Sequence, residues 1–197
     1  MKVTAIVGTY RKAGIIAQAV EELLAAARAS GAETDTVFLM DKHIEFCRNC
    51  RTCTQSSGPE RGRCPIQDDM DAVLRNLEEA DAIIFASPMN FGTVTAVMKR
   101  FIERMICYGY WPWGSMAPKN RIREKKKRAV VVTAAAAPAF VYWFTSQIVG
   151  LMKTAAGLLG AKTVGVLFIG LAAGKQQPEL GERWRHQARR LGEKLVA

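Results

Sequence analysis

The chain contains no run of about 20 consecutive apolar residues, the length that a membrane-spanning helix requires. Its beginning, MKVTAIVGTY, shows a strand pattern directly after a single lysine and lacks the apolar stretch and small-residue cleavage site of a signal peptide. The composition also excludes collagen-like, mucin-like and mostly disordered chains. We therefore expect a cytoplasmic protein without a transmembrane segment.

Histidine is scarce, with only His43 and His186. No Ser/His/Asp or Cys/His nucleophile set emerges, and Asp68 and Asp69 look like helix-start charges that the helix dipole favours, so no paired-carboxylate hydrolase site is expected either. The GxxxxGK[ST] and GxGxxG phosphate motifs are absent, which disfavours a nucleoside triphosphate site and a dinucleotide fold. We name no catalytic side chain and expect a cofactor to perform the chemistry.

What is present is the composition of one globular domain covering residues 1–197. The formal net charge is +10, with 49% hydrophobic and 23% charged residues. A chain of 197 residues can bury a sizeable core without disulfides or a structural metal, so we expect any metal to be functional.

Short apolar runs alternate with longer amphipathic ones. This pattern predicts parallel strands joined by helical crossovers, which is a doubly wound α/β sheet covered on both faces. The expected strands are 3–8, 36–40, 82–87, 129–133 and 163–170, and the expected helices are 15–29, 68–79, 94–106, 141–159 and 179–196.

Two segments interrupt this alternation: a cysteine-rich insertion at 41–66 and a loop at 107–128 that ends in basic residues. Both are longer than about 12 residues, and such connections in compact domains are usually functional or disordered.

The first expected strand leads into a helix through the sequence GTYRKAGII, residues 8–16. A helix N-terminus offers unpaired amides and a partial positive charge, which together favour a phosphate. An ordinary turn with solvated cations is the alternative. The candidate phosphate-binding residues are Thr9, Arg11, Lys12, Gly14, Ile15 and Ile16.

A second candidate loop follows the strand at 82–87. Its proline stiffens the turn, its glycine allows close approach of the backbone, and its phenylalanine offers a flat apolar surface, a combination suited to a planar ring. Alternatively, Phe91 belongs to the core. Thr93 or Thr95 can cap the next helix. The candidate residues are Ser87, Pro88, Met89, Asn90, Phe91 and Gly92.

The two loops together resemble those of flavodoxin-like NAD(P)H-dependent FMN reductases and their iron-sulfur flavoprotein relatives. Residues 8–16 are similar to the GSxRxxxNT loop, and residues 87–92 with Lys99 and Arg104 are similar to the SPxYF loop and its K...R helix. The match covers roughly residues 1–170. It implies a five-stranded flavodoxin-like fold that holds FMN, reduction by NAD(P)H, and a third wall of the flavin site after the fourth strand, formed by Thr133, Ala134 and Ala135.

The chain departs from this family at three positions. Ile15 and Ile16 stand where Asn and Ser/Thr are usual, and Asn90 replaces the usual Tyr. Each lost neutral hydrogen bond is worth on the order of 1 kcal/mol. We therefore expect phosphate binding to depend mainly on backbone amides, Thr9 and the two cations.

The cysteines follow a fairly specific pattern. Two residues separate Cys47 from Cys50 and Cys50 from Cys53, and ten residues separate Cys53 from Cys64. Three thiolates at this spacing are typical of an iron-sulfur cube, to which a more distant cysteine can add the fourth ligand. Zinc ligands more often form two separated pairs. A 4Fe-4S cluster is thus favoured, with zinc and unliganded thiols as alternatives, and Cys107 is expected to be a buried apolar residue.

Positive charge surrounds these cysteines and should lower the thiol pKa values and stabilise an anionic cluster. The arginines concerned are Arg48, Arg51, Arg61 and Arg63. The family resemblance extends to this segment, because iron-sulfur flavoproteins carry a compact four-cysteine motif here, followed by an acidic helix start that matches residues 68–70. Their gap before the fourth cysteine is usually shorter.

The segment 119–128, KNRIREKKKR, carries seven cations and follows Trp111 and Trp113. It could be a solvated loop, or it could face nucleic acid or a membrane surface. A middle hypothesis is that the cations attract NADPH or an acidic redox partner while the tryptophan loop covers the flavin.

The sequence therefore predicts an FMN-dependent NAD(P)H oxidoreductase, with a 4Fe-4S cluster as the favoured use of the cysteines. We expect a small-molecule or protein electron acceptor and, from the resemblance, a homodimer or homotetramer in which residues 111–116 form a contact surface. A flavodoxin-like electron carrier or redox sensor is the first alternative. A zinc-stabilised nucleic-acid-binding module is the second, and nucleic acid is the less favoured partner.

Overall fold

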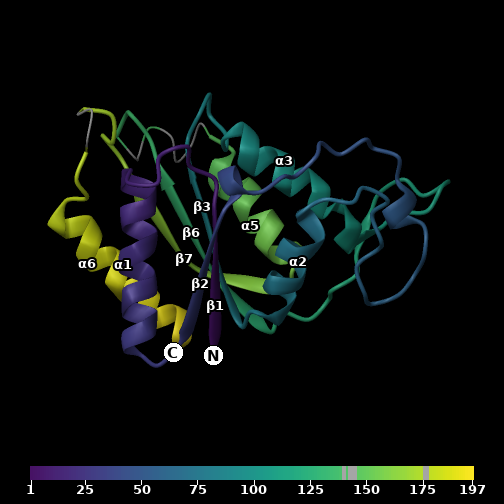
Figure 1. Ribbon diagram of the computed structural model, residues 1–197, viewed down its shortest axis with the longest axis horizontal. Helices are drawn as coiled ribbons and strands as arrows, with labels where there is room; N and C mark the ends of the chain where they lie inside the picture. Colours follow the sequence, from purple (N-terminus) through teal and green to yellow (C-terminus); the bar gives the residue numbers. More distant parts are fainter. Residues whose placement is uncertain (139–140, 142–145, 175–177) are drawn as a thin grey trace.

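The computed structural model describes residues 1–138, 141, 146–174 and 178–197 (Figure 1). The strands are β1 (Lys2–Val7), β2 (Glu33–Phe38), β3 (Ala82–Pro88), β4 (Gly109–Tyr110), β5 (Lys119–Asn120), β6 (Lys127–Ala134) and β7 (Ala161–Ile169). The α-helices are α1 (Ile15–Ala29), α2 (Met70–Glu79), α3 (Ala96–Arg104), α5 (Ile148–Leu158) and α6 (Glu182–Val196).

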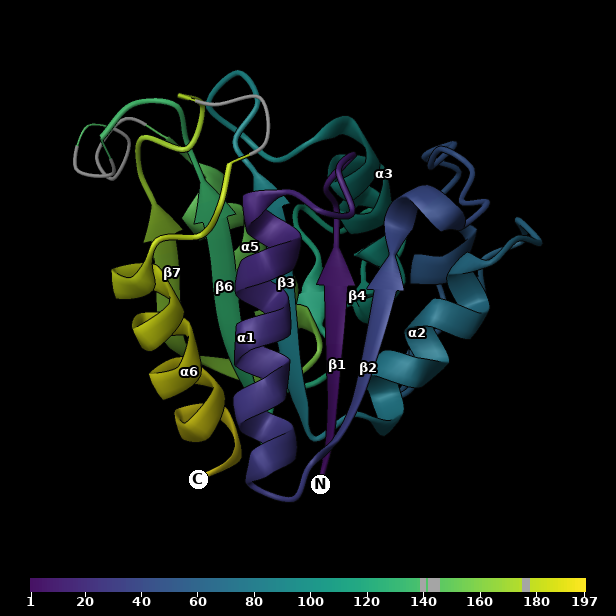
Figure 2. The ribbon, with the colours of Figure 1, turned by 60° about the vertical axis from the view of Figure 1, so that its left-hand side comes forward.

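Five parallel strands form the central sheet in the order β2-β1-β3-β6-β7. Helices α1 and α6 cover one face, and α2, α3 and α5 cover the other (Figures 1 and 2). Side chains alternate between these two layers, with Val3, Ala5 and Val7 packing toward α1 and Ile6 packing toward the opposite helices. The predicted doubly wound, flavodoxin-like fold is confirmed.

The edge strand β2 differs from its prediction. It spans Glu33–Phe38 rather than 36–40, and Leu39–Asp41 forms a 3-10 turn. Pairing with β1 begins at Lys2 and Glu33, where β2 alternates exposed and half-buried side chains. An apolar run could not mark this beginning, because polar residues suffice on the solvent side of an edge strand.

Several other helix and strand boundaries also differ from their predictions. The predicted helix 141–159 corresponds to α5 only over Ile148–Leu158, and its residues 142–145 lie outside the described residues. The last helix begins at Glu182 rather than at 179, and β6 begins at Lys127, so the end of the predicted basic loop belongs to the sheet.

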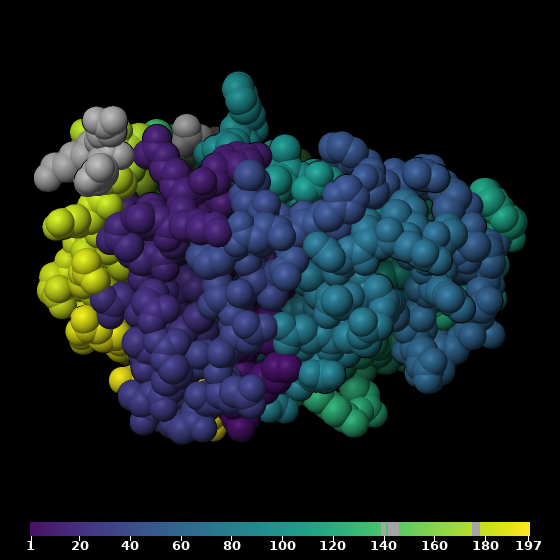
Figure 3. All heavy atoms as spheres, in the orientation of Figure 1, coloured from purple at the N-terminus to yellow at the C-terminus, as the bar shows by residue number. Residues whose placement is uncertain are grey.

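The two predicted interruptions lie against each other at one end of the molecule (Figures 1 and 3). Within the second one, β4 and β5 form a small antiparallel pair. Among the described residues, none of the helices has the length and apolarity needed to span a bilayer.

Candidate functional site

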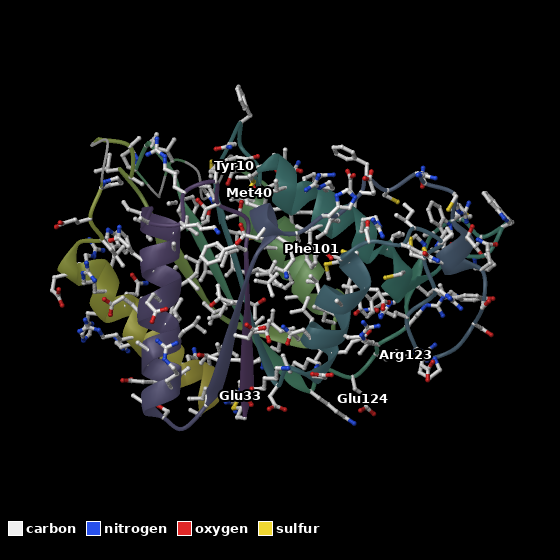
Figure 4. All side chains as sticks on the ribbon, in the orientation of Figure 1. Tyr10, Glu33, Met40, Phe101, Arg123 and Glu124 are labelled. Carbon is white, nitrogen blue, oxygen red and sulfur yellow. The ribbon has the colours of Figure 1, made fainter. Side chains whose placement is uncertain are left out.

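A cavity of about 600 Å³ lies at the carboxyl ends of β1, β3, β6 and β7. Tyr10 and Met40 mark this edge of the sheet in Figure 4, and Glu33 marks the opposite edge. Ligands of open α/β sheets bind at the carboxyl edge. The lining residues are Thr9, Tyr10, Arg11, Gly14, Ile15, Ile16, Pro88, Met89, Asn90, Ala134, Ala135, Ala136, Ala172, Ala173, Gly174 and Pro178.

The loop after β1 presents the start of α1 to this cavity. Gly14 is the N-cap residue, no side chain among the described residues caps the helix, and its first turn contains no acidic residue. The Thr9 hydroxyl accepts a 3.2 Å hydrogen bond from the Arg11 amide, which folds the loop back on itself. The helix therefore keeps the partial positive charge of its N-terminus at the cavity wall, where an anion is favoured.

Lys12 is directed elsewhere. Its Nζ lies 2.7 Å from Asp41 Oδ2 and 5.6 Å from the centre of the Phe38 ring, at the end of β2. It does not line the 600 Å³ cavity but an adjoining one, together with Arg11 and Gly14. A direct contact from Lys12 to phosphate stays a prediction.

The loop after β3 is held from below by buried side chains. Ser87 Oγ accepts a 3.1 Å hydrogen bond from the Thr95 amide, and Thr95 caps α3 by accepting from Met98 N. Thr95 is thus the cap expected from the sequence. Ser87 is fully buried and does not line the cavity, so its position in this chain supports the loop.

The tip of the same loop is a tight turn. The backbone groups of Asn90 and Thr93 exchange two hydrogen bonds, and Phe91 and Gly92 adopt φ values of 49° and 78°. Asn90 lines the cavity, whereas the Phe91 side chain is fully exposed and does not. A contact of Phe91 or Gly92 with a flavin therefore stays a prediction.

The loop after β6 lies beside the loop after β3. Ala134 and Ala135 line the cavity, while Thr133 lies beneath them, fully buried, and its Oγ1 has no hydrogen-bond partner in the described part of the chain. The Met89 amide donates to Ala134 O over 2.8 Å and so joins this loop to the one after β3. The small side chains leave room for a flat ligand.

Sequence reasoning missed a fourth wall. Tyr10 borders the cavity beside the predicted residues, and the loop after β7 adds Ala172, Ala173 and Gly174. The signal was available, because every strand of a parallel sheet ends at the same edge, but small apolar residues carry no chemical signature of their own.

The four predicted ligands Cys47, Cys50, Cys53 and Cys64 line one small cavity. Among the described residues, no three His, Cys, Asp or Glu side chains are placed to hold a single metal ion. A cluster would bind each of these thiols through a separate iron, and cluster binding at this cavity stays a prediction.

A close backbone contact brings Cys64 to the other three cysteines. A Cβ atom at Gly62 would lie 1.6 Å from Cys53 O, so only glycine fits at this crossing. The Gly62 amide donates a 2.8 Å hydrogen bond to Cys107 O, and Arg121 Nη2 donates to Cys53 O over 3.2 Å. Cys107 is buried, as expected.

Arg51 fastens the cysteine loop to the second interruption. Its guanidinium carbon lies 3.8 Å from the centre of the Trp111 ring and 4.2 Å from that of Trp113, and its Nη2 donates to Trp111 O over 2.7 Å. Asn49 and Arg51 have φ values of 52° and 59°, a conformation that costs about 1–2 kcal/mol per residue and persists only where surrounding contacts impose it.

The thiols lie in unequal environments. Burial, reinforced by the neighbouring thiols, raises the pKa of Cys53 to about 11, whereas a hydrogen bond from the Thr52 hydroxyl lowers the pKa of Cys50. Cys53 is therefore protonated at neutral pH unless a cationic centre stabilises its thiolate. Iron or zinc would supply such charge, so the pKa of Cys53 does not distinguish between the two.

Arginines from inside and outside the insertion surround this site, because the predicted Arg48 and Arg51 line the small cavity together with Arg104. Arg104 and Arg121 hydrogen-bond to Cys64 and to Cys53 O, whereas the predicted Arg61 pairs with Asp71 and Glu78. The sequence could not locate these contacts, because they depend on how distant segments cross.

Asp68 is not the simple helix-start charge expected from the sequence. Its carboxylate is fully buried and lies 2.6 Å from Arg104 Nη1. Although burial disfavours the charged form, hydrogen bonds from Arg104 and from backbone amides outweigh that cost and lower the pKa of Asp68. The position ties α2 to α3.

The tryptophan loop and the basic run lie away from the 600 Å³ cavity. Trp111 and Trp113 pack on Arg51, and Figure 4 shows Arg123 and Glu124 far from Tyr10 and Met40. The hypothesis that this loop covers the flavin site of its own chain is therefore wrong. A contact with the flavin site of another copy stays a prediction.

Comparison with known proteins agrees with this geometry. The family model for NADPH-dependent FMN reductases matches residues 1–142. An iron-sulfur flavoprotein of Archaeoglobus fulgidus is 32% identical over 200 residues, covering 100% of this chain and 79% of that protein. One from Methanocaldococcus jannaschii is 40% identical over 104 residues, which are 53% of this chain and 51% of that protein.

Solved structures show the same fold. The NAD(P)H:quinone oxidoreductase from Methanothermobacter marburgensis superposes with a TM-score of 0.72 at 20% identity, covering 100% of this chain and 96% of that one. An FMN-dependent NADH-azoreductase from Bacillus anthracis in complex with FMN gives 0.74 at 10% identity, with both chains fully covered. The chain belongs to the NADPH-dependent FMN reductase family.

Proposed function

We propose that the 600 Å³ cavity is the FMN site of an NAD(P)H oxidoreductase, with the phosphate at the start of α1 and the isoalloxazine ring between the loops after β3 and β6. The observation that carries this proposal is the uncapped N-terminus of α1, which opens into a cavity at the carboxyl edge of the sheet. Thr9 and Arg11 add a hydroxyl and a cation to it.

The residues of the chain bind and orient the coenzyme rather than react. Bound FMN supplies hydride and single-electron transfer. Asn90 offers an amide to the edge of the ring, and Ala134 and Ala135 offer an apolar wall that excludes water from one side. Because the alanine side chains of this wall are small, the loops after β3 and β7 determine how wide the site is.

We propose further that Cys47, Cys50, Cys53 and Cys64 hold a 4Fe-4S cluster. Support comes from their common cavity, from the glycine that brings Cys64 to Cys53, and from arginines that offset the negative charge of a thiolate-bound cluster. Two relatives are named iron-sulfur flavoproteins, which agrees with this assignment.

The partners in this proposal are a small-molecule or protein electron acceptor and further copies of the same chain. Large apolar side chains are exposed in the loops after β1, β2, β3 and β7, all at the edge that holds the cavity: Tyr10, Met40, Phe91 and Leu171. Such a rim suits a homodimer or homotetramer. A cytoplasmic location is part of this proposal, because cysteines that form no disulfide are typical of a reducing compartment.

The proposal is tested on protein purified without oxygen. We expect flavin absorbance that NADPH or NADH bleaches, with about four irons and four acid-labile sulfides per chain, the composition of a cube. A flavin that only a protein donor reduces would indicate an electron carrier. A colourless protein containing zinc would overturn both cofactor assignments.

A further inference from the structure

Arg104, at the end of α3, reaches one of the proposed cluster ligands. Its Nη2 lies 3.6 Å from Cys64 Sγ, within the range of a hydrogen bond to sulfur. The side chain is 2% exposed, so water does not compete for this donor. Arg104 is distant in sequence from the cysteine motif.

A set of buried acceptors fixes the orientation of this guanidinium. Nη1 donates to Asp68 Oδ2 over 2.6 Å and to Glu45 O over 2.9 Å, and Nη2 also donates to Asp68 Oδ1 over 3.2 Å. Asp68 is itself held, since its carboxylate accepts hydrogen bonds from the backbone amides of Glu45 and Met70. These bonds use both N–H groups of Nη1 and one of Nη2, so the second N–H of the planar Nη2 points in one direction only, toward Cys64, while the Nε–H has no partner among the described residues.

We propose that Arg104 is a positioning residue for Cys64, and that its hydrogen bond to the sulfur holds this cysteine as the fourth cluster ligand and raises the reduction potential of the cluster. This inference rests on the proposed 4Fe-4S site. Asp68 acts through Arg104 by fixing the direction of the guanidinium.

The spacing of the cysteines explains why Cys64 needs such help. Ten residues separate it from Cys53, whereas two residues separate each of the other neighbouring pairs. A longer connection leaves a ligand with more conformational freedom to lose on binding. Arg104 extends from a regular helix and therefore offers Cys64 a fixed point that its own loop does not supply.

The electrostatic effect has a definite sign. Reduction adds negative charge to the cluster and its thiolates, and an N–H aimed at a ligand sulfur stabilises that charge. Losing the hydrogen bond should therefore shift the midpoint potential to a more negative value. A purely structural ion pair between Arg104 and Asp68 would leave the potential unchanged as long as the protein stays folded.

Arg104→Lys is the main test. It keeps a cation for Asp68 but replaces the two-nitrogen fork by one ammonium, which cannot hold the same geometry toward both Asp68 and Cys64. Arg100→Lys is the matched control, because Arg100 lies one turn earlier on α3 and faces the Phe46 ring. The paired variant Arg104→Met/Asp68→Asn removes both partners together, in case a lone lysine disturbs folding.

Each variant is purified anaerobically as the full chain, and its midpoint potential and rate of iron loss to a chelator are measured. We expect Arg104→Lys to have a more negative potential and to lose iron about tenfold faster or more, the scale of lost outer contacts at metal sites. Arg100→Lys should match the wild type. Adding Arg104→Lys to Cys64→Ala should not accelerate iron loss further, because the acceptor sulfur is already gone.

The outcomes separate the two proposals. If the wild type contains no iron-sulfur cluster, both the proposed cluster and the role of Arg104 are overturned. If the wild type holds the cluster but Arg104→Lys behaves like Arg100→Lys, only the role of Arg104 is overturned. Additive iron loss in the variant combined with Cys64→Ala would also contradict it, since Arg104 would then act elsewhere.

Discussion

The hydroxyl of Thr95 donates a 2.6 Å hydrogen bond to the carbonyl of Gly8, a residue 87 positions earlier in the chain. Gly8 directly follows β1 and begins the proposed phosphate loop, and Thr95 is the N-cap residue of α3, which follows the proposed ring loop. Both ends of the bond are buried. One hydroxyl thus couples two neighbouring loops that both line the cavity.

Replacing Thr95 by valine should loosen both walls. The Gly8 carbonyl loses its partner and α3 loses its cap, so we expect the free energy of unfolding to fall by about 1–3 kcal/mol and FMN to bind more weakly. Urea unfolding and an FMN titration measure the two effects. Thr95→Ser keeps the hydroxyl and should stay near the wild type; equal losses in both variants would assign the effect to packing instead.

Gly62→Ala should disrupt the cysteine site. An added Cβ would collide with Cys53 O, and backbone cannot move aside as a side-chain tip can, so we expect a loss of about 1–3 kcal/mol in unfolding free energy together with lower iron content. The control is Gly150→Ala on α5, where the new methyl meets open space and should be neutral or stabilising. Normal iron content in Gly62→Ala would contradict the crossing described here.

The sequence predicted the fold because β1, β3 and β6 are almost continuously buried, and such apolar runs mark strands of a parallel sheet. It failed at β2, where an edge strand needs few apolar residues. The sequence also could not predict contacts between segments that are far apart in the chain. Nothing in the spacing of Arg104 from Cys64, or of Arg51 from Trp111, indicates that they meet.

The structure places some of the predicted site residues at the cavity and others away from it, depending on how far each lies from the end of a strand. Thr9 and Asn90 line the cavity, because a strand end fixes the residues next to it. Farther along the turn this constraint weakens. The hydrogen-bonded turn between Asn90 and Thr93 directs Phe91 outward, although its aromatic character suggested a wall of the cavity.

Arg51→Lys should release the tryptophan loop from the cysteine loop. Lysine cannot stack between two indole rings or reproduce the guanidinium contacts to the Trp111 carbonyl, so we expect about 1–2 kcal/mol less stability and a changed tryptophan emission spectrum. Arg48→Lys, in the same loop, should leave the emission unchanged. If both variants kept the wild-type spectrum, the stack would not persist in solution.

Lys127 belongs to the basic run but has a structural role. Its Nζ donates to Glu78 O over 2.5 Å and to Leu77 O over 3.2 Å, at the end of α2. Lys127→Met leaves these carbonyls unpaired, and we expect a loss of about 1–3 kcal/mol in a thermal or urea melt. Lys125→Met should change stability by less than about 0.5 kcal/mol, as exposed positions usually do. If Lys127→Met and Lys125→Met were equally stable, Lys127 would be a solvated side chain like Lys125, without a structural role.

Glu22 predicts a dependence on pH. Hydrogen bonds from Arg189 and then from Arg185 lower its pKa below the ordinary value of 4.5, against the opposing effect of burial. A depressed carboxyl pKa stabilises the fold above the ordinary value, and this contribution is lost as the pH falls through the folded-state pKa. The difference in unfolding free energy between the wild type and Glu22→Gln should therefore decrease as the pH is lowered from 7 to about 3.

Glu21→Gln is the control for that series. Glu21 pairs with Arg28 at the exposed surface, where ion pairs contribute little to stability. The unfolding free energies of Glu21→Gln and the wild type should therefore differ little at every pH. A Glu22→Gln gap that stays constant down to pH 3 would show that the carboxylate is not preferentially ionised in the folded state.

Calorimetric titration of the cofactor-free protein with FMN and with riboflavin, which lacks the phosphate, is the sharpest test of a phosphate site at the start of α1. Because charge-assisted hydrogen bonds contribute about 1.5–3 kcal/mol each, we predict one FMN per chain, bound at least tenfold more tightly than riboflavin, and a smaller difference in Thr9→Val. Equal affinities for the two ligands, or no binding of FMN, would contradict a phosphate site at the start of α1.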